Sequence, residues 1–436
     1  MSSAAPSAMR ALVFHLDSAL LPDEVKSLMA EYRLMVNEVI RVGLLSGATS
    51  RASLHRLAYS DLSRRHRGLS SYVLQAISNA LGILRAHRRR ERRGHHSRPP
   101  YVRRLFLKAR PESFHFDSTA EKLRISVGNG VWVMFALPVS SWHRAQMDAP
   151  GIETVLLTIK PGKVIVVISK ISPAAYQPTA VVALDTNEES LDGLIAAGSH
   201  AEWVRVPLGD IRAVQARHFV RRRRLAAKKA HDHRLMRFLV AGEGKRERDR
   251  VKSRLHLISK GLVKAAQGKR AAIVFENLTG IRRFSSRRLN RRLSAWPHRE
   301  LHRQIVYKAQ AAGVPVIFVS PYMTSRKCAM CGWTPLRSKA RTSARRADRM
   351  FVCGNPECTW KVDRQFNAGI NILRTALTAR PGLGGVRFHL DALSGDVMNP
   401  LYGPASRAAW GERMERESQT SAIKGVLATA STATGR

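Results

Sequence analysis

Four cysteines, the only ones in the chain, have the spacing that most directly predicts chemistry. Two residues separate Cys328 from Cys331, four separate Cys353 from Cys358, and 21 residues lie between the pairs. This is close to the two-knuckle spacing that lets four thiolates surround one zinc ion. Four thiolates leave no open coordination position, so we expect a structural Zn²⁺ ion and not a catalytic one. A disulfide framework or four unrelated buried cysteines are the weaker alternatives, because no cysteine lies elsewhere.

Two acidic residues follow apolar runs that are typical of buried strands. Asp185 follows the run Ala180–Leu184, and Glu276 follows the run Ala271–Phe275. If the two strands are neighbours, both carboxylates lie at one edge of the sheet, where ligands of open α/β sheets bind. Hydrolysis of a phosphodiester by two metal ions needs carboxylates that converge in this way. Each acid alone is more often a helix cap or a solvated turn, and only the pair in a basic chain favours a catalytic site.

The net charge of the chain predicts a polyanionic partner. Its 436 residues include 74 Lys and Arg against 32 Asp and Glu, which gives a formal charge of +42. This exceeds what a solubilising surface requires, and nucleic acid is the obvious polyanion. The sequence has no apolar run of about 18 residues and no signal-like N-terminus, which argues against a membrane partner. We therefore expect a soluble, cytoplasmic and nucleoid-associated protein.

Many of the basic residues are grouped in two blocks. Blocks of like charge repel themselves when unpaired and suit a phosphate backbone, although phosphate contacts carry no sequence preference. The candidate nucleic-acid-binding residues are Arg88, Arg89, Arg90, Arg92, Arg93, Arg221, Arg222, Arg223, Arg224, Lys228 and Lys229.

Hydrophobic periodicity predicts the elements of the first part of the chain. We expect a strand over Leu12–Leu16 and amphipathic helices over about 22–45 and 70–88, which together make a helical region. Two hairpins are expected over 123–137 and 154–169, each with a turn that contains glycine. The hairpins predict a small β domain that follows the first basic block.

From residue 180 onward, predicted strands and helices alternate, which indicates an α/β sheet. The strands are expected over 180–184, 193–197, 203–206, 271–275 and 314–319. The helices are expected over 211–239, with Asp210 as the capping residue, and over 252–267, 301–311 and 364–378. Past residue 379 the sequence is rich in Gly, Ser, Ala and Thr, and we expect much of it to be mobile.

Four runs in this second part resemble the motifs of a known family. Val181–Asn187 is similar to the first RuvC motif of TnpB-like proteins and compact type V CRISPR (Cas12-like) effectors, and Phe275–Leu278 is similar to the second. Residues 322–325 resemble the run that leads into the family's zinc insert, and Asn367–Ile372 resembles the end of the third motif. The resemblance covers about residues 180–378.

The resemblance implies a multidomain architecture of α/β and β parts. For the wedge domain and the recognition lobe, the resemblance rests on position along the chain and not on motifs. The implied parts are a small β-barrel-like wedge domain (1–16 and 100–175), an N-terminal helical recognition lobe (17–99), an RNase H-like (RuvC) domain (180–325) with a basic helical insertion (210–268), a zinc-binding insert (326–360), a last RuvC-like helix (361–378) and a mobile C-terminal tail (379–436).

The resemblance also implies RNA-guided DNA targeting. A guide RNA would pair with target DNA beside a short flanking duplex motif, and the RuvC-like site would cut the unwound DNA with Mg²⁺. Asp185 and Glu276 would hold the metal ions. Two other functions stay open, namely a guide-directed DNA-binding protein that cuts weakly or not at all, and an RNA-independent transposase.

One position departs from the family's pattern. The third motif usually has Asp two residues before the Asn, where this chain has Gln365, and the nearest acid is Asp363. Helix positions two apart point about 200° away from each other, so Asp363 cannot simply replace a carboxylate at 365. Either Asp363 caps the helix, or it precedes the first turn and a locally different backbone directs it to the metals as a third catalytic acid. A neutral Gln365 would weaken metal binding.

Overall fold

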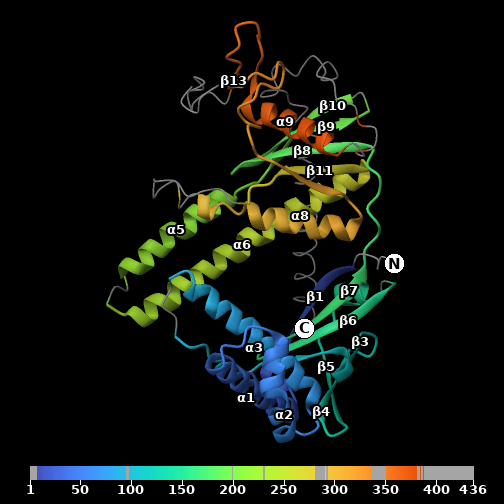
Figure 1. The fold of residues 1–436 in the computed structure, drawn as a ribbon, viewed down its shortest axis with the longest axis vertical. Coiled ribbons are helices and arrows are strands. Elements are labelled where there is room, and N and C mark those ends of the chain that lie inside the picture. Colours follow the sequence, from blue (N-terminus) through green and yellow to red (C-terminus); the bar gives the residue numbers. More distant parts are fainter. Residues whose placement is uncertain are drawn as a thin grey trace, which may run out of the picture. The chain divides into compact units, whose positions relative to one another are not determined.

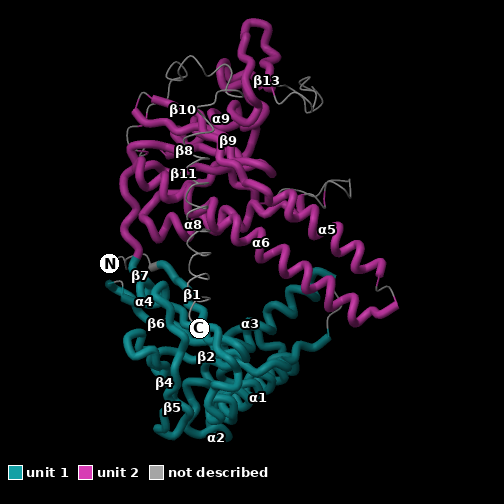
Figure 2. Tube along the Cα trace, turned by 180° about the vertical axis from the view of Figure 1, so that it is seen from behind, with its two compact units in different colours: residues 1–171 teal, residues 172–436 magenta. Residues whose placement is uncertain are grey.

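The computed structural model describes residues 7–94, 98–148, 150–198, 200–228, 231–279, 290, 293–334, 350–380, 383 and 386. The chain divides into two compact units, residues 1–171 and 172–436, which are coloured separately in Figure 2. The predicted tail over 379–436 lies almost entirely outside the described residues. Among the described residues, no helix has both the length and the apolar character needed to span a membrane.

Three helices make up the helical part of the first unit: α1 (Asp23–Leu45), α2 (Arg51–Arg65) and α3 (Ser70–Glu91). The helices predicted over 22–45 and 70–88 are therefore confirmed. The sequence did not predict α2, because only Leu54, Ala58 and Leu62 are buried along it and this apolar stripe is too narrow to stand out. Its start is nevertheless well defined by a capping box between Ser50 and Ser53.

Two antiparallel sheets complete the first unit. One has the strand order β1-β7-β6-β2 and the other β3-β4-β5, and both predicted hairpins are present. The strands are β1 (Ser7–His15), β2 (Leu107–Ala109), β3 (Phe114–Asp117), β4 (Lys122–Gly128), β5 (Val131–Ala136), β6 (Ile152–Lys160) and β7 (Lys163–Ile171), and the short helices are η1 (Ser18–Leu20), η2 (Pro111–Ser113) and α4 (Ser141–Met147). Helices and sheets share one core, in which Phe14, Tyr32 and Ile125 are all buried.

A mixed five-stranded sheet forms the centre of the second unit (Figure 1). Its strands are β8 (Ala180–Thr186), β9 (Ser190–Ala197), β10 (His200–Pro207), β11 (Ala271–Glu276) and β12 (Val316–Val319), in the order β10-β9-β8-β11-β12. β11 lies between β8 and β12 and is parallel to both, whereas β9 and β10 continue the sheet as an antiparallel meander. The predicted α/β sheet is confirmed.

Helices cover both faces of this sheet. Leu184 and Phe275 belong to the core on the side of α6 (His233–Gly268) and α8 (His298–Ala312). Ala183 and Val274 belong to a second core with α9 (Arg364–Ala379) and the cysteine region, which includes β13 (Met350–Val352) and β14 (Lys361–Asp363). Asp185 and Glu276, near the ends of β8 and β11, therefore stand at the boundary of a well-packed layer.

The helices that follow the sheet's first three strands differ from the prediction. The sequence predicted helices over 211–239 and 252–267, but the chain forms α5 (Ile211–Lys228) and then a 36-residue α6. Asp232 accepts a hydrogen bond from the backbone of Leu235 at 2.9 Å and so caps α6 much earlier than predicted. A buried pair between His218 of α5 and Glu243 of α6, 2.7 Å apart, joins the two helices side by side (Figure 1). The predicted cap, Asp210, uses its carboxylate to pair with Arg254 of α6 at 2.9 Å.

Two glycines let α9 approach the sheet closely. A Cβ atom on Gly369 of α9 would lie 2.7 Å from the Cα of Gly193 in β9, and a Cβ on Gly193 would lie 1.8 Å from the carbonyl oxygen of Ala183. Real Cβ atoms do not come this close to backbone atoms. The position of α9 over β8 and β9 therefore depends on the absence of side chains at both residues.

We predict that Gly369→Ala destabilises the protein by about 1–3 kcal/mol, because backbone atoms cannot move aside for the added methyl group as a flexible side chain would. Gly242→Ala in α6 is the matched control, since no atom outside its own helix turn lies within 4 Å of a Cβ built there. That change should stabilise α6 by up to about 1 kcal/mol. Denaturant unfolding of both variants measures the difference, and equal effects would contradict the close-packing explanation.

Candidate acidic site and metal centre

Four polar residues form a row across the second unit's sheet. Asp185 of β8 lies opposite Asp192 of β9, and Asp192 lies opposite Arg205 of β10. On the other side Phe275 pairs with Leu184, so Glu276 ends β11 beside Asp185. Side chains alternate between the faces of a strand, so Asp185 is on the same face as Ala183, which α9 covers. The sequence-predicted pair, Asp185 and Glu276, is therefore brought together.

Burial disfavours the charged forms of both Asp185 and Glu276. Burial, and then the charge of Glu276, raises the pKa of Asp185 to about 7, while a hydrogen bond from Asn187 acts in the opposite direction. Burial likewise raises the pKa of Glu276, whose Oε1 accepts a hydrogen bond from the hydroxyl of Thr324. In the part of the chain that the structure describes, neither carboxylate forms a salt bridge.

Asp192 and Arg205 were missed by the sequence analysis and belong to the same row. Asp192 is fully buried, and its carboxylate accepts hydrogen bonds from Arg205 Nε and, at 2.5 Å, from Ser190 Oγ. Asn187 Nδ2 connects the two acids, because it lies 3.2 Å from Asp185 Oδ2 and 3.1 Å from Asp192 Oδ2. An aspartate inside the apolar run Leu191–Ala197 was the available signal in the sequence.

Asp363 is the N-cap of α9, one of the two interpretations left open by the sequence. Its Oδ1 accepts a hydrogen bond from the backbone N–H of Gln365 at 2.8 Å. Its second oxygen, Oδ2, lies 3.4 Å from Arg205 Nη2, which also donates to Gln365 Oε1 at 3.2 Å. Asp363 and Gln365, at the start of α9, thus both contact Arg205.

The chemistry of Asp185 and Glu276 fits a hard divalent cation such as Mg²⁺. Both offer oxygen ligands, and burial makes their charged forms costly in the absence of a cation. In this structure Asp363 is not grouped with them in an arrangement that could hold a metal ion, and its catalytic role stays a prediction. Within the described residues, only the cysteines form a group of three or more His, Cys, Asp or Glu side chains arranged to hold a metal ion.

The four cysteines lie around one point. Their Sγ atoms are all within 4.8 Å of one another, with Cys328 and Cys358 3.9 Å apart and Cys331 and Cys353 3.6 Å apart. Zinc–sulfur bonds of about 2.3 Å at tetrahedral angles place sulfur atoms about 3.8 Å apart. The cluster can therefore bind a metal ion such as zinc, with all four positions taken by protein.

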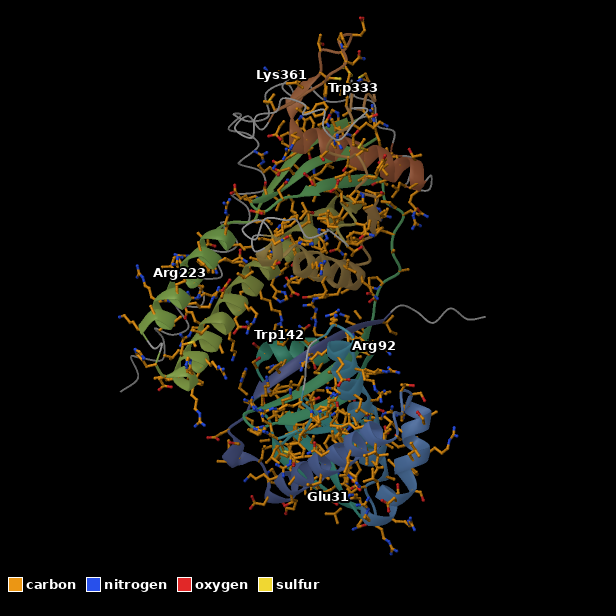
Figure 3. All side chains as sticks on the ribbon, turned by 60° about the vertical axis from the view of Figure 1, so that its left-hand side comes forward. Glu31, Arg92, Trp142, Arg223, Trp333 and Lys361 are labelled. Carbon is orange, nitrogen blue, oxygen red and sulfur yellow. The ribbon has the colours of Figure 1, made fainter. Side chains whose placement is uncertain are left out.

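Backbone groups support the cysteine cluster. A hydrogen bond from the backbone of Trp333 lowers the pKa of the Cys331 thiol to about 6, which favours the thiolate that metal binding needs. Gly332 adopts a positive φ of 76°, as a tight turn after a cysteine requires. Gly354 is needed for a different reason, because a Cβ there would lie 2.6 Å from the ring of Trp333, which Figure 3 labels.

Asparagines of α9 bind the segment that carries the first two cysteines. Asn367 Oδ1 accepts hydrogen bonds from the backbone of Ala329 at 3.0 Å and from Trp360 Nε1 at 3.2 Å. Asn371 Nδ2 donates to the carbonyl oxygens of Thr324 at 2.8 Å and Lys327 at 2.7 Å. The cysteine cluster and the helix that begins at Asp363 are therefore one structural assembly.

The predicted nucleic-acid-binding arginines have different surroundings. Arg88 donates to the carbonyl oxygens of Ala48 at 2.7 Å and Gly43 at 3.1 Å, so it fixes the end of α1. Arg222 pairs with Glu247 of α6. The residues whose side chains are exposed are Arg89, Arg90, Arg92, Arg93, Arg221, Arg223, Arg224 and Lys228, of which Arg92 and Arg223 are labelled in Figure 3. Lys229 lies outside the described residues.

Comparisons with known proteins show which families the second unit is similar to. Residues 298–372, which include all four cysteines and Asp363, match the model described as "Cas12f1-like, TNB domain". The TnpB-like protein MJ0751 of Methanocaldococcus jannaschii is 26% identical over 268 residues, which are 59% of this chain and 92% of that protein. These matches make the chain similar to TnpB-like proteins and compact type V (Cas12) effectors.

Two further comparisons show similarity to Cas12f proteins. The chain is 32% identical over 130 residues to the endodeoxyribonuclease Cas12f2 of a Micrarchaeota archaeon, a stretch that is 28% of this chain and 23% of that protein. A solved structure of Cas12f1 with sgRNA and target DNA aligns with a TM-score of 0.51 and 16% identity, covering 80% of each chain. At that identity the match shows a shared fold. Residues 28–126 also match a family described as "Uncharacterized protein MJ0013 family".

We predict that the protein purifies with one zinc ion per chain, measurable by elemental analysis. Cys353→Ser should release the metal and lower the melting temperature, because the binding energy of a closed four-thiolate site is also folding energy. Ser259→Ala is a control that removes a buried hydroxyl far along the sequence from the cysteines and should leave zinc content at one. Freshly purified protein without zinc would contradict the prediction.

Proposed function

We propose that this protein is an RNA-guided DNA-targeting protein with a RuvC-like acidic site. The observation that carries the proposal is the meeting of Asp185 and Glu276 on the parallel strands β8 and β11, beside the helix that follows the four-cysteine cluster. The relatives support it, because they include Cas12f endodeoxyribonucleases and a Cas12f1 solved with sgRNA and target DNA. The partners we infer are a guide RNA and target DNA with a short flanking duplex motif.

The proposed function assigns roles to the parts of the chain. We infer an RNase H-like (RuvC) domain over 180–325 and 361–378, with 210–268 as its basic helical insertion and 326–360 as its zinc insert. In the first unit, residues 17–99 would be the recognition lobe, and residues 1–16 and 100–175 the β-barrel-like wedge domain. The shared core of helices and sheets in that unit favours a recognition lobe and wedge that act as one body.

The charge of the chain supports the polyanionic partners. Arg223 and Arg224 are exposed on α5, and Arg89, Arg90 and Arg92 are exposed at the end of α3. Exposed arginines without a structural task are free to contact phosphate groups of a guide RNA or of the RNA–DNA heteroduplex. Arg88 and Arg222, which have partners within the protein, contribute less to such contacts.

The acidic site suits hydrolysis of a phosphodiester. When bound, a divalent cation would supply Lewis-acid activation of the phosphate and of a water nucleophile. Asp185 and Glu276 would hold it. Asn187 orients the Asp185 carboxylate through Oδ2, and Thr324 orients the Glu276 carboxylate through Oε1. These two hydrogen bonds limit the rotation of both acids.

A second candidate is a guide-directed DNA-binding protein with weak cleavage. The observation that favours it is the contact of Arg205 with both Asp363 and Gln365, because a cation of the protein then engages the acid nearest in sequence to the third-motif position. Asp185 and Glu276 alone give the site two carboxylates. We infer that this chain retains binding of guide-matched DNA and that the missing third carboxylate limits the cleavage of that DNA.

We predict that the full chain purifies with bound RNA, and that its preference for matched DNA is lost when the RNA is removed. Binding should weaken steeply with salt, by about 1,000-fold between 50 and 200 mM if six or more phosphates are contacted. The double change Arg223→Gln, Arg224→Gln should lower RNA affinity about tenfold. Lys26→Gln is the control, since Lys26 already pairs with Asp23 at 2.9 Å.

The outcome of this experiment separates the guide-directed functions from a transposase. RNA-free protein that shows the same target preference as the complex would exclude base pairing as the source of specificity. It would then favour the RNA-independent transposase and contradict the proposed function.

We predict that Gln365→Asp raises Mg²⁺-dependent cleavage of matched DNA by about tenfold or more, because it restores a carboxylate at the third-motif position. Gln365→Asn, which stays neutral, is the matched control and should give no increase. Adding Asp185→Ala to Gln365→Asp should abolish cleavage. That loss would assign the cleavage to the acidic site of Asp185 and Glu276. Single-turnover assays with guide-bound protein measure each variant.

Efficient cutting by the unchanged protein, abolished by Asp185→Ala and not improved by Gln365→Asp, would exclude the weak-cleavage candidate. The site would then be complete without residue 365.

A further inference from the structure

Arg205 of β10 is the one described cation that contacts the row of acids on the sheet directly. Its Nε donates to the Asp192 carboxylate, and its Nη2 lies 3.4 Å from Asp363 Oδ2 and 3.2 Å from Gln365 Oε1. The guanidinium also lies 5.3 Å from the centre of the Phe366 ring. Arg205 thus joins β9, β10 and the first turn of α9.

The ion pairs of Arg205 with Asp192 and Asp363 matter for stability because both carboxylates are buried. The side chains of Asp192 and Asp363 are 0% exposed, and that of Arg205 is 30% exposed. A buried carboxylate without a cation or sufficient hydrogen bonds is costly, and removing one partner of a buried ion pair leaves that cost uncompensated. One guanidinium compensates two fully buried carboxylates here.

The four acids at this edge of the sheet, Asp192, Asp363, Asp185 and Glu276, therefore fall into two pairs. Asp192 and Asp363 receive their positive charge from the protein, through Arg205. Asp185 and Glu276 receive hydrogen bonds from Asn187 and Thr324 but form no salt bridge within the described part of the chain. Burial raises the pKa of Asp185, and the charge of Arg364 opposes that rise without forming a salt bridge with it. The oxygens of Asp185 and Glu276 therefore stay available to a cation from solution.

We propose that Arg205 is the built-in counter-cation of this site, which neutralises Asp192 and Asp363, keeps Asp363 from acting as a metal ligand, and leaves a single divalent-cation position at Asp185 and Glu276. Arg205 is a positioning residue, because it acts through the carboxylates that it holds. The part of the inference that concerns the divalent cation rests on the proposed function, and the part that concerns Arg205, Asp192 and Asp363 does not.

The neutral residue at 365 agrees with this assignment. Gln365 Oε1 accepts a hydrogen bond from Arg205 Nη2, the same nitrogen that faces Asp363. Arg205 therefore has a neutral partner at position 365 and no third negative charge to compensate. A carboxylate at 365 would compete with Asp192 and Asp363 for one guanidinium. Gln365 and Arg205 are therefore matched to each other.

The first test measures stability of the full, zinc-loaded chain in buffer without added divalent cations. Arg205→Met should lower the melting temperature by about 6–12 °C, because two buried carboxylates lose their cation. Arg205→Met combined with Asp192→Asn should regain at least half of the loss, since one of the uncompensated charges is gone. Arg254→Met is the matched control, because its ion pair with Asp210 is 34% and 46% exposed, and it should cost about 2 °C or less.

The second test counts divalent cations with Mn²⁺, by electron paramagnetic resonance and calorimetry. The unchanged chain should bind one Mn²⁺ that Glu276→Gln removes and Asp363→Asn does not. Arg205→Met should bind Mn²⁺ about tenfold more tightly or take up a second ion, because the competing positive charge is absent. Added Mn²⁺ should also raise the melting temperature of Arg205→Met more than that of the unchanged chain.

Three results would overturn the inference: Arg205→Met as stable as the unchanged chain, no gain on adding Asp192→Asn, or two Mn²⁺ ions in the unchanged chain with one lost in Asp363→Asn. If Arg205→Met alone does not fold, recovery of folded protein in the double variant supports the inference and continued failure to fold overturns it. Loss of guide dependence would refute the proposed function while leaving these stability results intact, so the two failures are distinguishable.

Discussion

Like charges on neighbouring strands are the constraint on which the second unit depends. Asp192, Asp185 and Glu276 lie on three adjacent strands, which in a sheet are about 4.8 Å apart. Asp192 and Glu276 are buried, and Asp185 is partly buried. Hydrogen bonds from Asn187 and Thr324, and the ion pair with Arg205, make this arrangement possible. The antiparallel strands β9 and β10 therefore do more than extend the sheet, because they bring a cation to its acidic edge.

The same constraint explains the position of α9 and the cysteine cluster. Asp363 ends β14, caps α9 and contacts Arg205, so the cysteine region is joined to the sheet at a charged residue. Further along α9, Gly369 contacts Gly193, and Asn371 binds the chain just before the first cysteine. A metal ion at the cysteines would thus stabilise the segment that presents the start of α9 to the acids.

The parts of the site that follow from local sequence could be predicted, and those that depend on strand register could not. The cysteine spacing and the acids after two apolar runs are local patterns, and the geometry of both is present. The Arg205–Asp192 pair needed the pairing of β9 with β10, which no local pattern gives. Helix α2 lacked a wide apolar stripe, and the buried His218–Glu243 pair that joins α5 to α6 links residues 25 positions apart, which no local pattern gives. The catalytic roles and domain boundaries stay predictions.

The glycine contact between α9 and β9 has a mechanical consequence. With Gly369 against Gly193, and with Asn367 and Asn371 hydrogen-bonded on the cysteine side, α9 cannot slide along its own axis without a backbone collision. Asp363 and Gln365 begin the same helix whose asparagines bind the cysteine segment. Any displacement of α9 would therefore change the contacts with Arg205 and the position of the cysteine cluster together.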